Sequence, residues 1–157
     1  MTETKPAAEP KQTITPHLVV RGAGAASEWY QRALGATERG RIPVPGGRFM
    51  QIELRLGDST VMLADEFPEL GVVSPLSVGG TAGALVIHTD DVDALWRRAL
   101  EAGAKVSVPL QEVFWGDRHG EIFDPFGHRW GLAQHLRDVP AEEIRAAAAA
   151  MFGGNPT

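Results

Sequence analysis

The spacing of apolar residues along the chain changes between a period of two and a helical period, and so divides it into elements. Residues 13–20, TITPHLVV, form an apolar and β-branched run of strand length. Residues 22–36 place their apolar positions on one helical face, and Gly35 ends this predicted helix. The residues on that face are Ala26, Trp29, Tyr30, Ala33 and Leu34.

The next segment alternates between apolar and mixed positions. This period of two over residues 49–56 predicts a strand with two unlike faces. The sequence GDS at 57–59 predicts a hairpin turn into a second strand over 60–64. The two alternating sets are Met50, Ile52, Leu54 and Leu56 against Phe49, Gln51, Glu53 and Arg55.

The same order of elements then recurs. Residues 83–104, GALVIHTDDVDALWRRALEAGA, predict a strand and then a helix that Thr89 or Asp90 caps and Gly103 ends. Two further strands follow, HGEIF and HRWGLAQ, joined by the turn DPFG. The apolar face of the second helix consists of Val92, Leu95, Trp96, Ala99 and Leu100.

The recurrence indicates an internal duplication. The segments HLVV…EWYQRAL and ALVI…ALWRRAL superpose with a shift of about 67 residues. A final amphipathic helix begins at Pro140 and ends before Gly153, and its stripe of Ile144, Ala148, Met151 and Phe152 predicts packing on its own domain or on a partner subunit. The predicted divisions are a disordered tail over 1–12, a first module over 13–66, a linker over 67–82, a second module over 83–137 and the final helix over 138–153.

Composition narrows the function classes. The chain has 157 residues, a net charge of −5 and no cysteine. The lack of clustered basic residues argues against a nucleic-acid partner, and no apolar stretch has the length of a membrane span. The absence of cysteine excludes disulfides, thiol nucleophiles and thiolate metal sites. The default prediction is a cytoplasmic protein with no membrane partner.

The doubled unit, with its helix endings RALGA and LEAGA and the turn DPFGH at 124–128, resembles the vicinal oxygen chelate superfamily. This superfamily groups glyoxalase I, bleomycin-resistance proteins and extradiol dioxygenases, and the terminal EEIRAAAAAMF is most similar to its PhnB-like branch. The resemblance implies an α+β fold of two paired βαβββ modules whose curved sheets surround a shared cavity. It also implies a homodimer, since relatives often exchange modules between subunits.

In enzymatic members of that superfamily the cavity holds a divalent metal. The resemblance places the four ligand positions at Thr15 or His17, near Leu63, at Ala84 or Val86, and at Gly131. Only His17 among these carries a usable donor, whereas a first-row metal needs three or four N or O donors. The usual metal site is therefore predicted to be absent, and no cofactor is expected.

Strand alternation predicts what faces the cavity instead. The residues expected under the helices are Leu18, Val20, Ile52, Leu54, Leu85, Ile87, Ile122, Trp130 and Leu132. The residues expected to face inward are His17, Gln51, Glu53, Arg55, His119, Glu121, Arg129 and His135. This polar set has three interpretations: recognition of a polar or anionic small molecule, a displaced metal site, or ion pairs in a wet groove with no ligand.

The loop FWGDRHG at 114–120 adds a second candidate feature. Trp115 and Arg118 would suit a planar or anionic ligand, through stacking and bidentate donation. The alternative is a local ion pair between Asp117 and Arg118, with Trp115 packed on a neighbouring subunit.

Two functions follow from this sequence. The leading hypothesis is a metal-free small-molecule binding protein, of sequestering or resistance type. Its predicted ligand-binding residues are His17, Gln51, Glu53, Arg55, Trp115, Arg118, His119 and Glu121. The alternative is a metal-dependent lyase, isomerase or dioxygenase that holds a divalent metal at a displaced site. The metal ligands in that alternative are His17, Glu53, His119 and Glu121.

Overall fold

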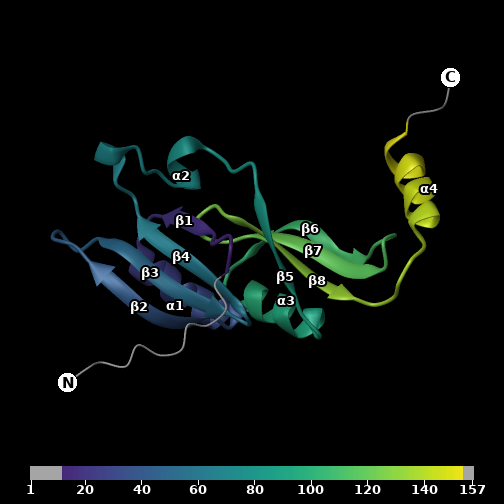
Figure 1. Ribbon diagram of the computed structural model, residues 1–157, viewed down its shortest axis with the longest axis horizontal. Coiled ribbons are helices and arrows are strands. Elements are labelled where there is room, and N and C mark those ends of the chain that lie inside the picture. Colours follow the sequence, from purple (N-terminus) through teal and green to yellow (C-terminus); the bar gives the residue numbers. More distant parts are fainter. Residues whose placement is uncertain (1–11, 154–157) are drawn as a thin grey trace.

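The computed structural model describes residues 12–153 and contains two sheets, each covered on one face by a helix (Figure 1). The first module consists of β1 (His17–Val20), α1 (Ala23–Leu34), β2 (Thr37–Pro43), β3 (Phe49–Leu56) and β4 (Ser59–Asp65). The second consists of β5 (Ala84–His88), α3 (Val92–Glu101), β6 (Lys105–Glu112), β7 (Asp117–Phe123) and β8 (Arg129–His135). Between them lie the 3-10 helix η1 (Pro68–Leu70) and α2 (Pro75–Val78), and α4 (Ala141–Phe152) follows the second module.

The two sheets have the same topology. Their strand orders are β1-β4-β3-β2 and β5-β8-β7-β6, and the first strand of each module runs parallel to the last. This arrangement confirms the α+β fold of two βαβββ modules. Strands β2 and β6 were not identified from the hydrophobic pattern. Strand β2 is an edge strand of mostly exposed residues, so its sequence shows no alternation of apolar and polar positions. In β6, by contrast, Val106, Val108 and Leu110 do alternate with other residues and could have predicted a strand.

Each covering helix is capped by a side chain from the last strand of its own module. The Asp65 carboxylate accepts hydrogen bonds from the backbone N–H groups of Gly22 and Ala23 at the start of α1, at 3.1 and 2.7 Å. The side-chain oxygen of Gln134 accepts from the Val92 N–H at the start of α3, at 3.0 Å. These matching contacts support the duplication.

The residue that caps α3 from its own segment is Asp91. Its carboxylate accepts from the Ala94 N–H at 3.1 Å, so the prediction of Thr89 or Asp90 was wrong. The Thr89 hydroxyl instead accepts from the N–H of Asp91, which orients the capping residue.

The residues predicted to pack under the helices do so, but the predicted faces of Phe49 and Met50 were wrong. Phe49 packs against the core and Met50 is 49% exposed, where the pairing of β2 with β3 shifts register between Ile42 and Pro43. Leu18, Val20, Ile52, Leu54, Ile122, Trp130 and Leu132 are buried under the helices, and Leu85 and Ile87 are partly buried against the same core. The whole predicted face of α1 is buried as well. At about 25 cal/mol per Å² of buried apolar area, these side chains supply the main driving force of the fold.

A buried carboxylate joins the two modules. Asp124, in the turn after β7, accepts hydrogen bonds from the Tyr30 hydroxyl of α1 and from the Trp130 indole N–H at 2.8 Å. Its other oxygen accepts from the backbone N–H groups of Phe126 and His128, at 2.8 and 3.0 Å. Burial, with the nearby Asp124, raises the pKa of Tyr30 well above its usual value. The hydroxyl therefore remains a donor at all ordinary pH values.

Further polar contacts reinforce this junction. The Trp29 indole donates to the Ala102 carbonyl at 2.7 Å, and the Arg98 guanidinium donates to the carbonyls of Gln31 and Arg32. The His128 ring contacts the Val19 carbonyl at 2.8 Å, so this histidine ties the turn after β7 to the first module. Both modules are therefore held in one arrangement by α1 and α3 and by the DPFGH turn.

The segment predicted as a linker contains ordered structure. The Glu66 carboxylate accepts hydrogen bonds from the backbone N–H and the hydroxyl of Ser74 and from the hydroxyl of Ser77, and it pairs with Arg21 at 3.5 Å. The hydrogen bonds from Ser74 and Ser77 lower the pKa of Glu66 to about 2. A carboxylate that stays ionised therefore fixes η1 and α2 against the first module.

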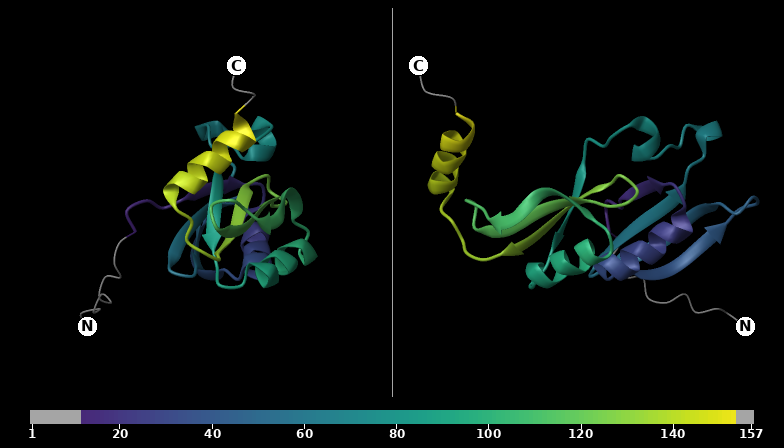
Figure 2. Two further views of the ribbon diagram at one scale, coloured as in Figure 1. Left: turned by 90° about the vertical axis from the view of Figure 1, so that its right-hand side faces the viewer. Right: turned by 180° about the vertical axis from the view of Figure 1, so that it is seen from behind.

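The two ends of the described chain differ in how they are held. Gln12 exchanges side-chain hydrogen bonds with the backbone of Thr60; the rest of the predicted tail lies outside the described residues. Helix α4 has no buried residue and stands apart from both sheets (Figures 1 and 2). Within residues 12–153, no helix has the length and apolar character needed to cross a membrane.

We expect Asp124→Asn to lower the free energy of unfolding by about 2–3 kcal/mol, because four donors lose a charged acceptor in a buried place. Tyr30→Phe removes one of these donors and should cost about 1–2 kcal/mol. Urea denaturation followed by circular dichroism measures both values. A loss below about 0.5 kcal/mol for Asp124→Asn would show that the junction does not depend on this carboxylate.

Candidate functional site

The face of each sheet that lies away from its helix is here called the open face. On the second sheet, the open face of β7 carries Asp117, His119, Glu121 and Phe123, because the intervening positions lie under α3. Strand β8 adds Arg129, Gly131, Ala133 and His135 to this face, and β5 adds Ala84, Val86 and His88. Acidic, basic and imidazole groups therefore surround a strip of small residues.

That strip lies in the middle of β8 and is covered by side chains of the neighbouring strands. Gly131 pairs with Glu121 on one side and with Val86 on the other, and Ala133 pairs with His119 and His88. A Cβ atom at position 131 would lie 3.2 Å from a Val86 methyl and 3.3 Å from Nε2 of His119. The His119 imidazole thus leans over the place where a side chain on residue 131 would begin.

A polar cluster lies at the end of this face. The Asp117 carboxylate accepts from the Trp115 indole N–H at 3.2 Å and contacts Nδ1 of His135 at 2.9 Å. Nε2 of His135 contacts Asp138 at 2.8 Å, and the Trp115 ring lies 5.7 Å from the ring of His119. The hydrogen bonds with Asp117 and Asp138 raise the pKa of His135. Trp115, whose side chain is 37% exposed, is thereby oriented toward His119.

Arg129 lies at the opposite end of the face. Its guanidinium is 4.9 Å from the centre of the Phe123 ring, and its Nε is 4.0 Å from the Glu121 carboxylate. That Nε is buried and has no hydrogen-bond partner among the described residues. A buried donor without an acceptor is costly, so this nitrogen is suited to an acceptor supplied by a ligand.

Arg118 does not share the open face. It lies on the side of β7 that faces α3, where it pairs with Asp93 at 2.9 Å. The alternative of a local pair between Asp117 and Arg118 was therefore wrong, because Asp117 contacts Trp115 and His135 instead. The alternation of β7 separates neighbouring residues onto opposite faces.

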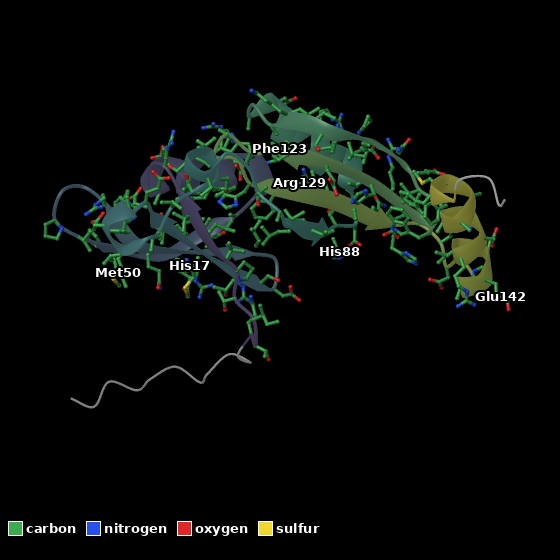
Figure 3. All side chains as sticks on the ribbon, turned by 90° about the horizontal axis from the view of Figure 1, so that it is seen from above. His17, Met50, His88, Phe123, Arg129 and Glu142 are labelled. Atoms are coloured by element: carbon green, nitrogen blue, oxygen red, sulfur yellow. The ribbon has the colours of Figure 1, made fainter. Side chains whose placement is uncertain are left out.

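The remaining predicted residues lie on the first sheet. His17 pairs with Met62, and Gln51, Glu53 and Arg55 follow along β3, with Arg55 donating to the Gly57 carbonyl at 3.1 Å. Figure 3 shows His17 and Met50 on this sheet and Arg129 and Phe123 on the other. The predicted ligand-binding residues thus form two groups on two sheets, and no hydrogen bond or ion pair described within residues 12–153 joins the groups.

The superfamily's metal positions can now be placed. Val86 and Gly131 are direct neighbours across β5 and β8, and neither offers a donor. Leu63 was assigned to the second position, but it is fully buried under α1; its neighbour Met62 lies beside His17 on the open face. Among the described residues, no three His, Asp or Glu side chains are grouped so that they could hold a metal ion.

A crevice among the described residues includes open-face residues of β5. It has a volume of about 520 Å³, runs along the edge of β5 between the modules, and is lined in part by Ile14, Leu56, Val86 and His88. Val86, the strand neighbour of Gly131, lines this crevice, whereas Gly131 itself does not.

We expect the stability contribution of His135 to depend on pH. Because its pKa is raised in the folded state, the contribution is fully present below the ordinary pKa near 6.5 and is lost as the pH rises through the raised value. The melting temperature of the wild type should therefore exceed that of His135→Gln most near pH 6, with the difference shrinking toward about pH 9. Calorimetry at several pH values checks this, and a constant difference would contradict it.

The chain is similar to known proteins in both sequence and fold. Residues 12–132 match the model of the glyoxalase/bleomycin resistance protein/dioxygenase superfamily. The chain is 42% identical over 144 residues to the uncharacterized protein Mb0911c of Mycobacterium bovis, covering 90% of this chain and 95% of that protein. Its fold is similar to that of TioX from Micromonospora (27% identity, TM-score 0.63, covering 80% of this chain and all of that one). It is also similar to the fold of TnmS3, an antibiotic binding protein from Streptomyces (24% identity, TM-score 0.61, covering 82% of this chain and 99% of that one). The chain therefore belongs to the glyoxalase/bleomycin resistance protein/dioxygenase superfamily.

Proposed function

We propose that the protein binds a small organic molecule on the open face of its second sheet without a resident metal. The observation that carries this proposal is the buried, unpartnered Nε of Arg129, which shares the open face with the Trp115–His119 ring pair and with the small residues Gly131 and Ala133. A flat apolar surface together with a few directed polar groups is typical of ligand sites.

The chemistry of this face defines the ligand class. The exposed Trp115 ring offers a stacking surface, and the adjacent His119 extends it. Arg129 provides a charged donor whose Glu121 neighbour, at 4.0 Å, is too distant for a good hydrogen bond. These features favour a molecule with an aromatic or conjugated part and an anionic or carbonyl group.

We further propose that a second copy of the chain completes the cavity. The open face of the first sheet carries His17, Gln51 and Glu53, which one chain leaves uncovered. If each copy places its first sheet over the second sheet of its partner, a two-fold pair covers all four open faces. The predicted homodimer and both groups of predicted residues are then accommodated by one arrangement.

The relatives support binding as the function. The superfamily's own description includes bleomycin resistance, and TnmS3 is an antibiotic binding protein on a similar fold. We therefore retain a sequestering or resistance role. The predicted PhnB-like assignment also stays a proposal, supported by the DPFGH turn and the final helix.

The proposal predicts a specific loss of binding. We expect 1-anilinonaphthalene-8-sulfonate, an aromatic anion, to bind with enhanced fluorescence in the presence of EDTA, and bleomycin to serve as a competing probe. Arg129→Ala should weaken binding of the aromatic anion about tenfold or more, because a charge-assisted hydrogen bond is lost. Trp115→Phe should weaken it severalfold through lost stacking area.

Arg118→Ala is the matched control, because Arg118 lies on the other face and pairs with Asp93 in an exposed ion pair. Its dissociation constant should stay within about twofold of the wild type. Equal losses in Arg118→Ala and Arg129→Ala, or no EDTA-resistant binding at all, would overturn the proposal.

The metal-dependent alternative retains one supporting observation. His119 and Glu121 lie two residues apart on one open face, and the partner's first sheet would bring His17 and Glu53 toward them. Elemental analysis after incubation with Zn²⁺, Ni²⁺, Mn²⁺ or anaerobic Fe²⁺ tests this. We expect no retained metal, whereas about one equivalent per chain, lost in Glu121→Ala, would establish the alternative.

A further inference from the structure

Helix α4 has the properties of a docking element without a partner in the single chain. None of its residues is buried, and Met151 and Phe152 are 67% and 79% exposed. Among the described residues, no hydrogen bond or ion pair connects its side chains to another element. A helix of 12 residues alone in water is only marginally stable, so packing of its apolar stripe is what would hold it.

The path into α4 is fixed on the second module. The backbone N–H groups of Leu136 and Arg137 donate to the Gly116 carbonyl at 2.9 and 3.1 Å. A Cβ at Gly116 would lie 2.1 Å from the Arg137 carbonyl oxygen, so the loop and the segment after β8 are in close contact. His135 and Asp138 add a side-chain contact at 2.8 Å. The helix is therefore directed by the sheet rather than hanging from a loose tether.

The direction of α4 indicates what it meets. Helix α3 covers one side of the second sheet, and α4 rises on the other side, beyond the end of β8 (Figures 1 and 2). Whatever covers the open face of the second sheet must therefore pass beside α4. In the proposed function that covering element is the first sheet of a second copy, and the present inference rests on that arrangement.

The first sheet carries a surface that suits α4. Ile42 pairs with Gln51 and so lies on the open face near the exposed edge strand β2, where it is 43% exposed. Met50, 49% exposed, lies on the same side of this sheet as His17 (Figure 3). Arg39, in the bulge between Glu38 and Gly40, is exposed and has no hydrogen bond or ion pair with the described residues.

Charge complements this apolar surface. The first turn of α4 holds Glu142 and Glu143, which likewise have no partner within residues 12–153. Arg39 of one copy can therefore face this acidic turn of the other, while Ile42 and Met50 meet the stripe formed by Ile144, Ala148, Met151 and Phe152. The same contact also protects β2, whose outer edge is unpaired in its own sheet.

We propose that α4 docks on the β2 edge of the first sheet of a second copy, and so clamps the two copies together around the ligand face. Two symmetric contacts of this kind form in each dimer. The clamp lies outside the ligand-contacting residues, so dimer strength and ligand binding can be altered separately.

Sedimentation equilibrium on full-length variants tests the clamp. Met151→Asp places a charge in the stripe and should raise the dimer dissociation constant at least about tenfold. Ala146→Asp adds the same charge on the opposite side of the helix and should change the constant less than about twofold. Arg39→Glu should weaken the dimer, and Glu142→Arg combined with Glu143→Arg should restore it.

Cross-linking locates the contact, because the natural chain has no cysteine. A chain carrying Ala148→Cys is mixed with a chain carrying Met50→Cys and treated with a short bismaleimide. We expect a mixed cross-linked dimer. Glu28→Cys, exposed on α1 away from the open face, replaces Met50→Cys as the control and should give none.

The outcomes separate this inference from the proposed function. If the protein is dimeric and Arg129-dependent binding persists, but Met151→Asp leaves the dissociation constant unchanged, the clamp is wrong and the binding face stands. Equal cross-linking to positions 50 and 28 also overturns the clamp. A protein that stays monomeric at all concentrations overturns both the clamp and the cavity shared between copies, while binding by one chain is still measured independently.

Discussion

The geometry of the whole molecule depends on the Asp124 carboxylate. It accepts from Tyr30 in the first module and from Trp130, Phe126 and His128 in the second, so one buried charge orients α1 against the turn between β7 and β8. The cost of burying this charge is offset only because four donors surround it. With α1 fixed against the second module, both open faces are turned away from the helical layer. The uncovered sheets follow from that constraint, and they are the surfaces that the proposed second copy covers.

Duplication explains why the two modules share a frame but differ in their faces. Asp65 and Gln134 cap equivalent helices from equivalent strands, so the structural contacts were kept in altered form. The open faces are not constrained in this way, because their residues neither cap a helix nor pack in the core. They were free to diverge, and the first face carries His17, Gln51 and Glu53 whereas the second carries Gly131 and Ala133 between its charged groups. Function in this fold therefore lies on the surfaces whose residues are least constrained by packing.

The core was predictable from the sequence and part of the site was not. Period-two and helical spacing identified Ile52, Leu54 and Ile122 as buried, since burial acts on every second strand residue. Alternation also placed His119 and Glu121 together on one face. The same alternation places Arg118, between Asp117 and His119, on the opposite face, so its assignment to the ligand-binding set from the loop FWGDRHG does not follow from the strand pattern. The role of Asp117 depends on its contacts with His135 and Trp115, and that of Arg129 depends on a buried Nε without an acceptor. Contacts between strands cannot be read from the residue pattern of a single strand.

Glycine at position 131 has consequences beyond the metal chemistry known in the superfamily. A carboxylate there would project from the centre of the open face and draw a cation to it, whereas with glycine the Val86 methyls and the His119 imidazole lie next to that place. In the proposed metal-free site, the Arg129 guanidinium is the cationic group that meets an oxygen acceptor of the ligand. A metal dication and a guanidinium are both positive, so the same oxygen-bearing class of molecule suits either site. This is how a resistance or sequestering protein can share a fold with lyases and dioxygenases.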